Sequence, residues 1–187
     1  MKNSYALVTG ATSGIGLEIS KDLAKRGYNL ILVARTKDRL DSLSSELANE
    51  YNIDCDFFSS DLTLINSPNE IYEYTSQKKY NVNILINNAG ISDPIPALEE
   101  DLDQFKRVIQ IDLISCFHLA QLCAQHMETQ ESGGAIVNVA SIHGFVGSSP
   151  NNQPGYTAAK GGLINLTREL ALELSLIHIS EPTRPVL

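Results

Sequence analysis

Short apolar runs alternate along this chain with longer segments of helical spacing. Leu40, Leu43 and Leu47, for example, recur at the spacing of one helical face. The apolar runs are continuous, as expected of strands buried on both faces of a parallel sheet. They cover residues 5–8, 30–33, 55–58, 84–86 and 135–139. The pattern predicts an α/β fold: a doubly wound, Rossmann-like parallel sheet of right-handed βαβ units.

Length and composition narrow the class of protein. The 187 residues, 43% of them hydrophobic, suit one globular domain. A net charge of -8 disfavours nucleic acid and anionic membranes as partners and favours a small-molecule substrate. The three cysteines have no metal-ligand spacing, and no apolar run reaches the roughly 18 residues of a membrane span. Together with a start that lacks a secretion signal, this predicts a cytoplasmic protein without a metal.

A glycine-rich segment follows the first predicted strand and opens into a helix. Residues 9–16 have the spacing G-x-x-x-G-x-G, which differs from the common G-x-G-x-x-G. Glycines allow a tight turn and a close backbone approach, and a helix N-terminus attracts a pyrophosphate. The alternative is a plain turn without a ligand. The position favours dinucleotide binding by Gly10, Thr12, Ser13, Gly14, Ile15 and Gly16.

The end of the second predicted strand carries Arg35. An acidic residue there would accept hydrogen bonds from the adenosine ribose, whereas an arginine suits a 2′-phosphate. We therefore expect NADP(H) in preference to NAD(H), with a solvated arginine as the alternative. Asp61 and Leu62, after the third strand, are weaker candidates for the adenine end of the site.

Tyr156 and Lys160 are the candidates for proton chemistry. They stand four positions apart, on one face of a predicted helix. An ammonium near a phenol lowers the phenol's pKa from about 10 towards the range of an acid/base catalyst. Ser141, after the fifth strand, could hydrogen-bond a carbonyl oxygen or serve as a turn residue. Asp112 lies among the apolar positions of a predicted helix over residues 102–127 and therefore needs a partner, a water or a proton.

Taken together, these motifs resemble the short-chain dehydrogenase/reductase family. The resemblance covers residues 5–173, and its motifs occur in the family's order. They are the glycine motif, Asn87-Asn88-Ala89-Gly90, Ser141, and the pair Tyr156 and Lys160. The resemblance implies an NAD(P)-dependent oxidoreductase that acts on a carbonyl or alcohol and whose intact parent is a homo-oligomer.

The same resemblance implies roles for individual residues. Tyr156 would donate the proton to the carbonyl, Ser141 would polarise that carbonyl, and Lys160 would bind the nicotinamide ribose and tune Tyr156. Asn88, Ala89 and Gly90 would line the cofactor or seat the central strands. The resemblance leaves these two roles open.

Two departures from the family pattern stand near the reacting end. Asp112 occupies the position of a family asparagine that holds a water in a proton relay, and an ionised carboxylate accepts hydrogen bonds but donates none. We hypothesise that Asp112 keeps the water and shifts the pH optimum. The segment from Ser141 to Tyr156 is also longer than usual, with the extra length at residues 149–154, and we expect it to reshape the substrate mouth.

The last residues predict a boundary. Residues 174–184 resemble an in-frame translation of a synthetic transposase adapter used in preparing sequencing libraries, and a natural, divergent C-terminus is the alternative. We therefore divide the chain into a C-terminally incomplete dinucleotide-binding domain, residues 1–173, and a non-native tail, residues 174–187. By resemblance the family continues with further strands, so we expect a sheet truncated after its fifth strand and the following helix.

The leading interpretation is an NADP(H)-preferring oxidoreductase with Tyr156 as its acid/base group. Two other functions fit the same scaffold: an isomerase or dehydratase, and a dinucleotide-binding regulatory module without turnover. A third alternative is a fragment that is inactive by itself.

Overall fold

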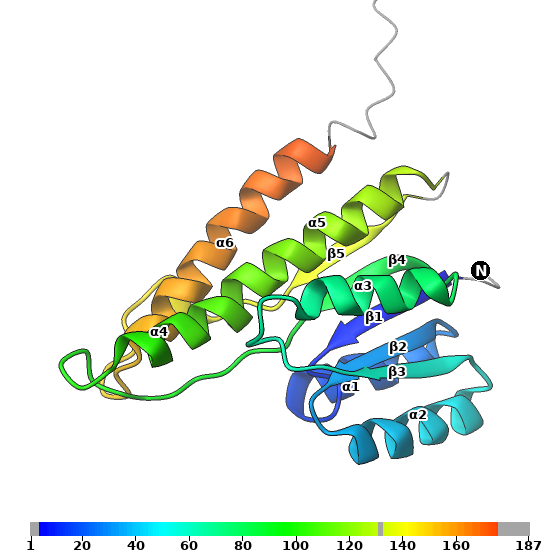
Figure 1. Cartoon of the computed structure of the whole chain (residues 1–187), viewed down its shortest axis with the longest axis horizontal. Helices are drawn as coiled ribbons and strands as arrows, with labels where there is room; N and C mark the ends of the chain where they lie inside the picture. The colour runs from blue at the N-terminus through cyan, green and yellow to red at the C-terminus, as the bar shows by residue number, and fades with distance from the viewer. Residues whose placement is uncertain (1–3, 131–132, 176–187) are drawn as a thin grey trace, which may run out of the picture.

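The computed structural model describes residues 4–130 and 133–175 as a parallel sheet with helices on both faces (Figure 1). The strand order is β3-β2-β1-β4-β5, and every neighbouring pair is parallel. The strands are β1 (Ser4–Thr9), β2 (Asn29–Ala34), β3 (Cys55–Ser59), β4 (Asn81–Asn87) and β5 (Ala135–Asn138). This confirms the predicted doubly wound, Rossmann-like sheet.

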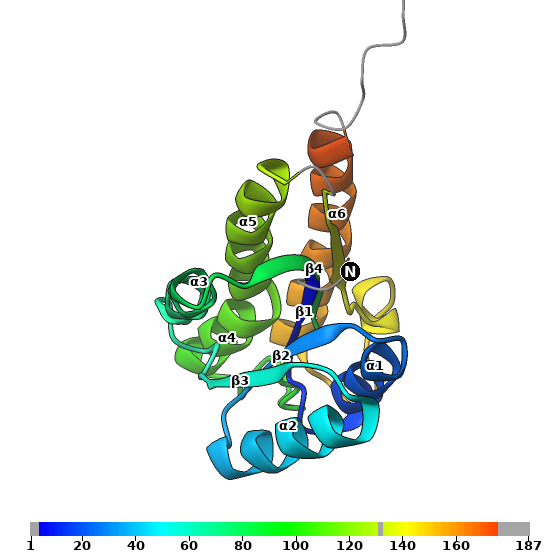
Figure 2. The same cartoon turned by 90° about the vertical axis from the view of Figure 1, so that its right-hand side faces the viewer.

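Two layers of helices bury the two faces of the sheet (Figure 2). One layer consists of α1 (Gly14–Lys25) and α2 (Lys37–Tyr51). The other contains α3 (Ser67–Gln77), α4 (Leu102–Ile109), α5 (Ser115–Glu128) and α6 (Pro154–Ser175). Alternate residues of each inner strand enter opposite cores: Leu30 packs towards α2, and Ile31 towards α3 and α5. Burial on both faces explains why the strands are continuously apolar.

The predicted helix over residues 102–127 is interrupted in the structure. A five-residue π-helical segment, η1 (Gln110–Ile114), separates α4 from α5 and contains Asp112. The whole run, Leu102–Glu128, is long and apolar enough to cross a membrane by length and composition. In the structure it covers the sheet, with Leu119 and Cys123 in the core. Interruptions of this kind often occur at functional sites.

The last strand is short and lies at the sheet edge. β5 ends at Asn138, one residue before the predicted end, and Val137 on it is 46% exposed. The carbonyl of Val139 instead accepts a hydrogen bond from Lys160. An edge position for the fifth strand was expected. The predicted tail lies almost wholly outside the described residues, since only Leu174 and Ser175 belong to α6, so its non-native origin stays a prediction.

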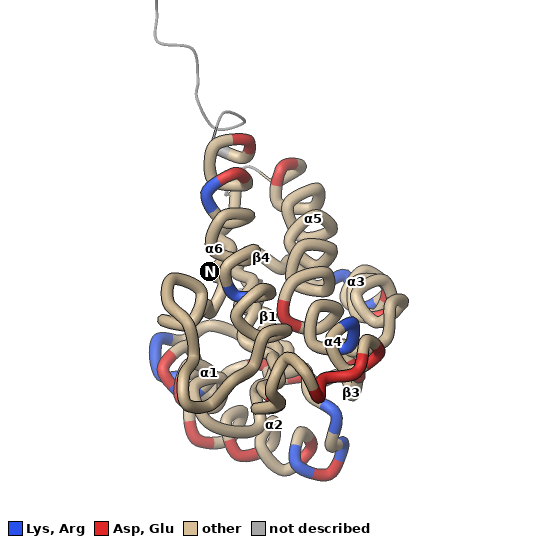
Figure 3. Tube along the Cα trace, turned by 90° about the vertical axis from the view of Figure 1, so that its left-hand side faces the viewer, with Lys and Arg blue, Asp and Glu red and all other residues tan. Residues whose placement is uncertain are grey.

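Charges of both signs are distributed over the surface helices (Figure 3). Basic residues occur at the start of α2, where Lys37 and Arg39 follow Arg35. The cysteines do not form disulfides: Cys116 and Cys123 are buried, and burial raises the pKa of each thiol to about 12. Both thiols are packing residues.

Ile31→Ala should lower the free energy of unfolding by about 2–5 kcal/mol, because the lost side chain leaves a cavity between the sheet and the helices α3 and α5. Ile31 is 0% exposed, whereas Ile65 is 69% exposed and provides the matched control. Chemical denaturation measures both variants. Equal effects of Ile31→Ala and Ile65→Ala would contradict the described core.

Candidate active site

A cleft lies at the carboxyl ends of β1, β2 and β4. Here the order of the strands changes direction: the chain runs outward from β1 to β3 on one side and from β4 to β5 on the other. Dinucleotides bind at this switch point in sheets of this topology. The cavity measures about 380 Å³. Its lining includes most of the predicted cofactor residues: Gly10, Thr12, Ser13, Ile15, Arg35, Leu62, Asn88, Ala89 and Gly90.

Glycines let the first turn pack tightly against the end of β4. Gly10 has φ 64°, and a Cβ there would lie 2.8 Å from Asn88 Nδ2. A Cβ on Gly16 would lie 2.4 Å from both Asn88 Nδ2 and the Gly10 carbonyl oxygen. Gly14 has φ 54° and open space around it, so its conformation alone favours glycine. Gly14 and Gly16 therefore shape the turn without lining the cleft.

The N-terminus of α1 opens towards this turn without a capping side chain. The side chain of Ser13 at the N-cap makes no capping hydrogen bond, and the first turn carries no acidic residue. Free amides and the positive end of the helix dipole are suited to an anion. The Ser60 hydroxyl, also in the cleft lining, is buried without a hydrogen-bond partner among the described residues. Both features fit a bound dinucleotide with its phosphates and ribose hydroxyls.

Thr9 connects β1 to the segment after β4. Its hydroxyl oxygen accepts hydrogen bonds from the amides of Asn88 and Ala89, each at 3.0 Å, and donates to the Ile86 carbonyl at 3.2 Å. The side-chain amide of Asn88 in turn donates to the backbone carbonyl of Thr9 at 3.0 Å. The segment of Asn88, Ala89 and Gly90 therefore seats the central strands and also lines the cleft.

The adenine end contains one cation that the sequence analysis missed. Arg39 lines the cleft together with Arg35. Its signal in the sequence was a second arginine four positions after the first. Asp61 is absent from the lining and accepts hydrogen bonds from the amide and hydroxyl of Thr63. Burial favours a higher pKa for Asp61, but the hydrogen bonds from Thr63 and the positive charges of Arg35 and Arg107 outweigh it, so the pKa is lowered.

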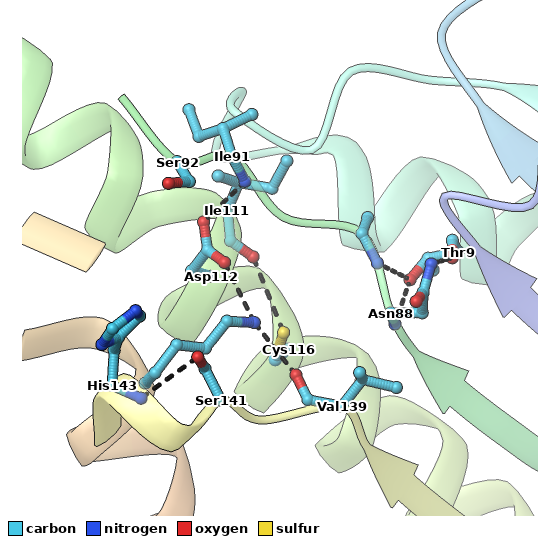
Figure 4. Close-up of polar contacts among 12 residues, drawn as sticks. Thr9, Asn88, Ile91, Ser92, Ile111, Asp112, Cys116, Val139, Ser141 and His143 are labelled. Carbon is cyan, nitrogen blue, oxygen red and sulfur yellow. Dashed lines mark hydrogen bonds and ion pairs between the residues drawn. The ribbon is translucent and has the colours of Figure 1, made fainter. Parts of the chain in front are cut away.

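At the reacting end, Lys160 and Asp112 form a buried ion pair (Figure 4). Lys160 Nζ lies 3.0 Å from Asp112 Oδ1 and donates to the Val139 carbonyl at 3.0 Å. The same Nζ lies 5.6 Å from the centre of the Tyr156 ring. The amide of Ile91 donates to Asp112 Oδ2 at 2.9 Å. The partner that Asp112 was predicted to need is therefore Lys160, together with a backbone amide.

Burial and the two partners of Asp112 shift its pKa in opposite directions. Removal of the carboxylate from water raises its pKa, and the ammonium of Lys160 and the amide of Ile91 offset part of that rise.

Ser141 begins a short 3-10 helix, η2 (Ile142–Gly144), that packs against α6. Its hydroxyl oxygen accepts the amide hydrogen of His143 at 3.2 Å, so the hydroxyl's own hydrogen stays available for donation. His143 Nδ1 is buried without a hydrogen-bond partner among the described residues. Sequence reasoning missed His143, whose signal was its place two positions after Ser141.

The loop that follows β4 is hydrogen-bonded to the longer segment between Ser141 and Tyr156. The Ser92 hydroxyl donates to the side-chain oxygen of Gln153, which is buried in the longer segment between Ser141 and Tyr156. Gln104 on α4 donates to the Asp93 carboxylate at 3.2 Å. The loop after β4 is therefore hydrogen-bonded both to the longer segment and to α4.

Comparison with known proteins agrees with this geometry. The family model described as short chain dehydrogenase matches residues 4–180. The chain belongs to this family. The family membership makes it an NAD(P)-dependent oxidoreductase of the dehydrogenase/reductase type.

Individual relatives of this short-chain dehydrogenase are similar over most of its length. An uncharacterized oxidoreductase of Thermotoga maritima is 32% identical over 96% of this chain and 68% of its own. D-beta-hydroxybutyrate dehydrogenase of Cupriavidus necator is 36% identical over 92% of this chain and 66% of its own. A short-chain dehydrogenase from Sphingobium yanoikuyae, solved in complex with NADPH, superposes with a TM-score of 0.84 at 32% identity, covering 93% of this chain and 67% of that one. The chain thus spans about two thirds of the length of these relatives.

Thr9→Val should lower the free energy of unfolding by about 2 kcal/mol, because the amides of Asn88 and Ala89 lose their buried acceptor while the side-chain shape is kept. Thr9→Ser keeps a hydroxyl and should lose less. Thr129→Val, which removes an exposed hydroxyl, is the matched control. Chemical denaturation decides between them, and equal stabilities of Thr9→Val and Thr129→Val would contradict the structural role of the Thr9 hydroxyl.

Proposed function

We propose that this enzyme moves a hydride between NADP(H) and the carbonyl or alcohol group of a small molecule, with Tyr156 as its acid/base group. The observation that carries the proposal is Lys160 Nζ, held 5.6 Å from the centre of the Tyr156 ring and next to Gly90, which lines the cleft. When bound, the nicotinamide supplies or accepts the hydride, and the protein contributes orientation and the proton.

Two features of the cleft support a dinucleotide, and the second of them favours NADP(H). The uncapped start of α1 would hold the pyrophosphate, and Gly10, Thr12 and Ser13 would lie along it. Arg35 and Arg39 would bind the 2′-phosphate, because guanidinium groups match phosphate oxygens in charge and geometry. NADP(H) is therefore preferred to NAD(H).

The proton chemistry falls to Tyr156 and its neighbours. In the reductive direction the Tyr156 hydroxyl donates its proton to the carbonyl oxygen, and in the oxidative direction the phenolate takes the proton of the alcohol. Lys160 favours the phenolate and would bind the nicotinamide ribose. Ser141 would donate its hydroxyl hydrogen to the carbonyl oxygen, since its oxygen already accepts the His143 amide.

We also propose that the enzyme is cytoplasmic and that its intact parent is a homo-oligomer. The free cysteines support a reducing compartment. Substrate screening should begin with 3-oxoacyl thioesters and 3-hydroxy acids, because relatives are named 3-oxoacyl-[acyl-carrier-protein] reductase and D-beta-hydroxybutyrate dehydrogenase. Tight NADPH binding without turnover across this panel would favour a regulatory module, and conversion without NADPH consumption would favour an isomerase or dehydratase.

Tyr156→Phe should reduce turnover by about a hundredfold or more, because the ring stays beside Lys160 while the transferable proton is lost. NADPH absorbance measures the rate and fluorescence titration measures cofactor binding, which should persist. Tyr28→Phe removes a phenolic hydroxyl far from the motif in sequence and serves as control. A fully active Tyr156→Phe variant would rule out the assigned acid/base role.

Arg35→Glu should weaken NADPH binding by about tenfold or more and leave NADH binding little changed, because the new carboxylate repels only the additional phosphate. Lys37→Glu makes the same change in charge two residues further on, outside the cleft lining. Fluorescence titration with each cofactor gives the four dissociation constants. An equal loss for NADPH and NADH, or an equal effect of Lys37→Glu, would contradict the proposed 2′-phosphate site.

A further inference from the structure

The ion pair between Asp112 and Lys160 is almost completely removed from water. The Asp112 side chain is 0% exposed and that of Lys160 is 5% exposed, with 3.0 Å between Oδ1 and Nζ (Figure 4). Lys160 is the group assigned to favour the phenolate of Tyr156. A carboxylate in direct contact with that ammonium must therefore alter its effect.

The surrounding backbone fixes this contact. The Ile91 amide holds one oxygen of Asp112, and the Val139 carbonyl holds the ammonium from the other side. A Cβ on Gly90 would lie 2.4 Å from Asp112 Oδ1 and 3.5 Å from Lys160 Nζ. Gly90 thus leaves the space in which the two charged groups meet. The π-helical segment carries Asp112 into that space.

We propose that Asp112 is a positioning residue that shares the charge of Lys160 and thereby sets the pH at which Tyr156 exchanges its proton. This inference rests on the proposed acid/base role of Tyr156. It gives a direct route by which Asp112 would shift the pH optimum, namely contact of its carboxylate with the ammonium, while the retained water stays a prediction.

The direction of the effect follows from electrostatics. An unopposed ammonium near a phenol stabilises the phenolate and lowers its pKa. A carboxylate 3.0 Å from that ammonium cancels part of the field, and low solvent access keeps both charges effective over short distances. Tyr156 therefore ionises at a higher pH than it would beside an unpaired lysine. Oxidation, which needs the phenolate, gains rate at higher pH, and reduction, which needs the phenol, persists to higher pH.

Other titratable groups on the elements around Tyr156 do not replace this pair. Burial raises the pKa of the Cys116 thiol to about 12, so it stays neutral. The charged side chains on α4, Asp103, Lys106 and Arg107, are exposed, and Glu100 lies beside Gly155, with Oε1 3.0 Å from a Cβ built there. Besides Asp112, the titratable and charged groups on the elements that contact α6 are Asp103, Lys106, Arg107, Cys116, His118, Cys123, His126, Glu128 and His143. Besides Tyr156 and Lys160, α6 itself carries Arg168, Glu169 and Glu173.

The test is a titration of Tyr156 itself in the full chain. NMR of protein labelled with carbon-13 at the phenolic carbon of tyrosine follows each ionisation, and Tyr156→Phe identifies the signal. Asp112→Asn keeps an oxygen acceptor for Lys160 and removes the charge. We expect the Tyr156 midpoint to fall by about one pH unit. Glu169→Gln removes one exposed carboxylate from α6, the helix that carries Tyr156, and we expect it to leave the Tyr156 midpoint unchanged.

A second variant guards against poor folding of Asp112→Asn. Gly90→Ala keeps both charges but pushes the carboxylate away from Lys160, so the Tyr156 midpoint should move in the same direction by a smaller amount. An unchanged or raised midpoint in a folded variant of either kind would overturn the inference.

The titration needs no turnover, which separates this inference from the proposed function. A lowered midpoint in Asp112→Asn supports the electrostatic role even where Tyr156→Phe stays active, a result that would overturn only the assigned catalysis. Where turnover is measurable, the rate of alcohol oxidation in Asp112→Asn should rise at a lower pH by the same shift. An unshifted pH profile despite a shifted midpoint would contradict the link to catalysis.

Discussion

The hydroxyl of Thr9 stands where the central strands β1 and β4 separate, and the rest of the site depends on how that junction is closed. Beyond the last paired residues, the amides of Asn88 and Ala89 have no strand to pair with, and buried amides without acceptors are costly. Thr9 accepts both. The glycine turn can then pack against Asn88, because Gly10 and Gly16 have no side chains to prevent it.

The segment after β4 links the two ends of the site. Asn88 bonds to the glycine turn at the phosphate end, Gly90 leaves room for the ion pair, and Ile91 donates its amide to Asp112 at the reacting end. Four consecutive residues therefore contact both the predicted cofactor turn and the predicted proton chemistry. A shift of this backbone would disturb the two functions together.

The sequence was sufficient for the sheet, its parallel order and the one-face arrangement of Tyr156 and Lys160, because these follow from local periodicity. It was not sufficient for contacts between distant segments. No local pattern in the sequence predicts the π-helical interruption at Asp112. That Asp112 pairs with Lys160 depends on how α6 packs against α4 and η1. Arg39 was missed because its place in the cleft beside Arg35 depends on how the first turn of α2 packs in the folded chain. The burial of His143 Nδ1 could not be predicted for the same reason, since it depends on the packing of η2.

The ion pair is difficult to explain as a device for stability. Burying a carboxylate and an ammonium costs several kcal/mol for each ion, and their attraction often does no more than offset that cost. An asparagine, which the resemblance to the family implies at this position, could accept a hydrogen bond from Lys160 without a second buried charge. The arrangement also requires a π-helical segment and a glycine at position 90. A costly contact made by the lysine beside Tyr156 is better explained by its effect on that phenol than by its contribution to folding.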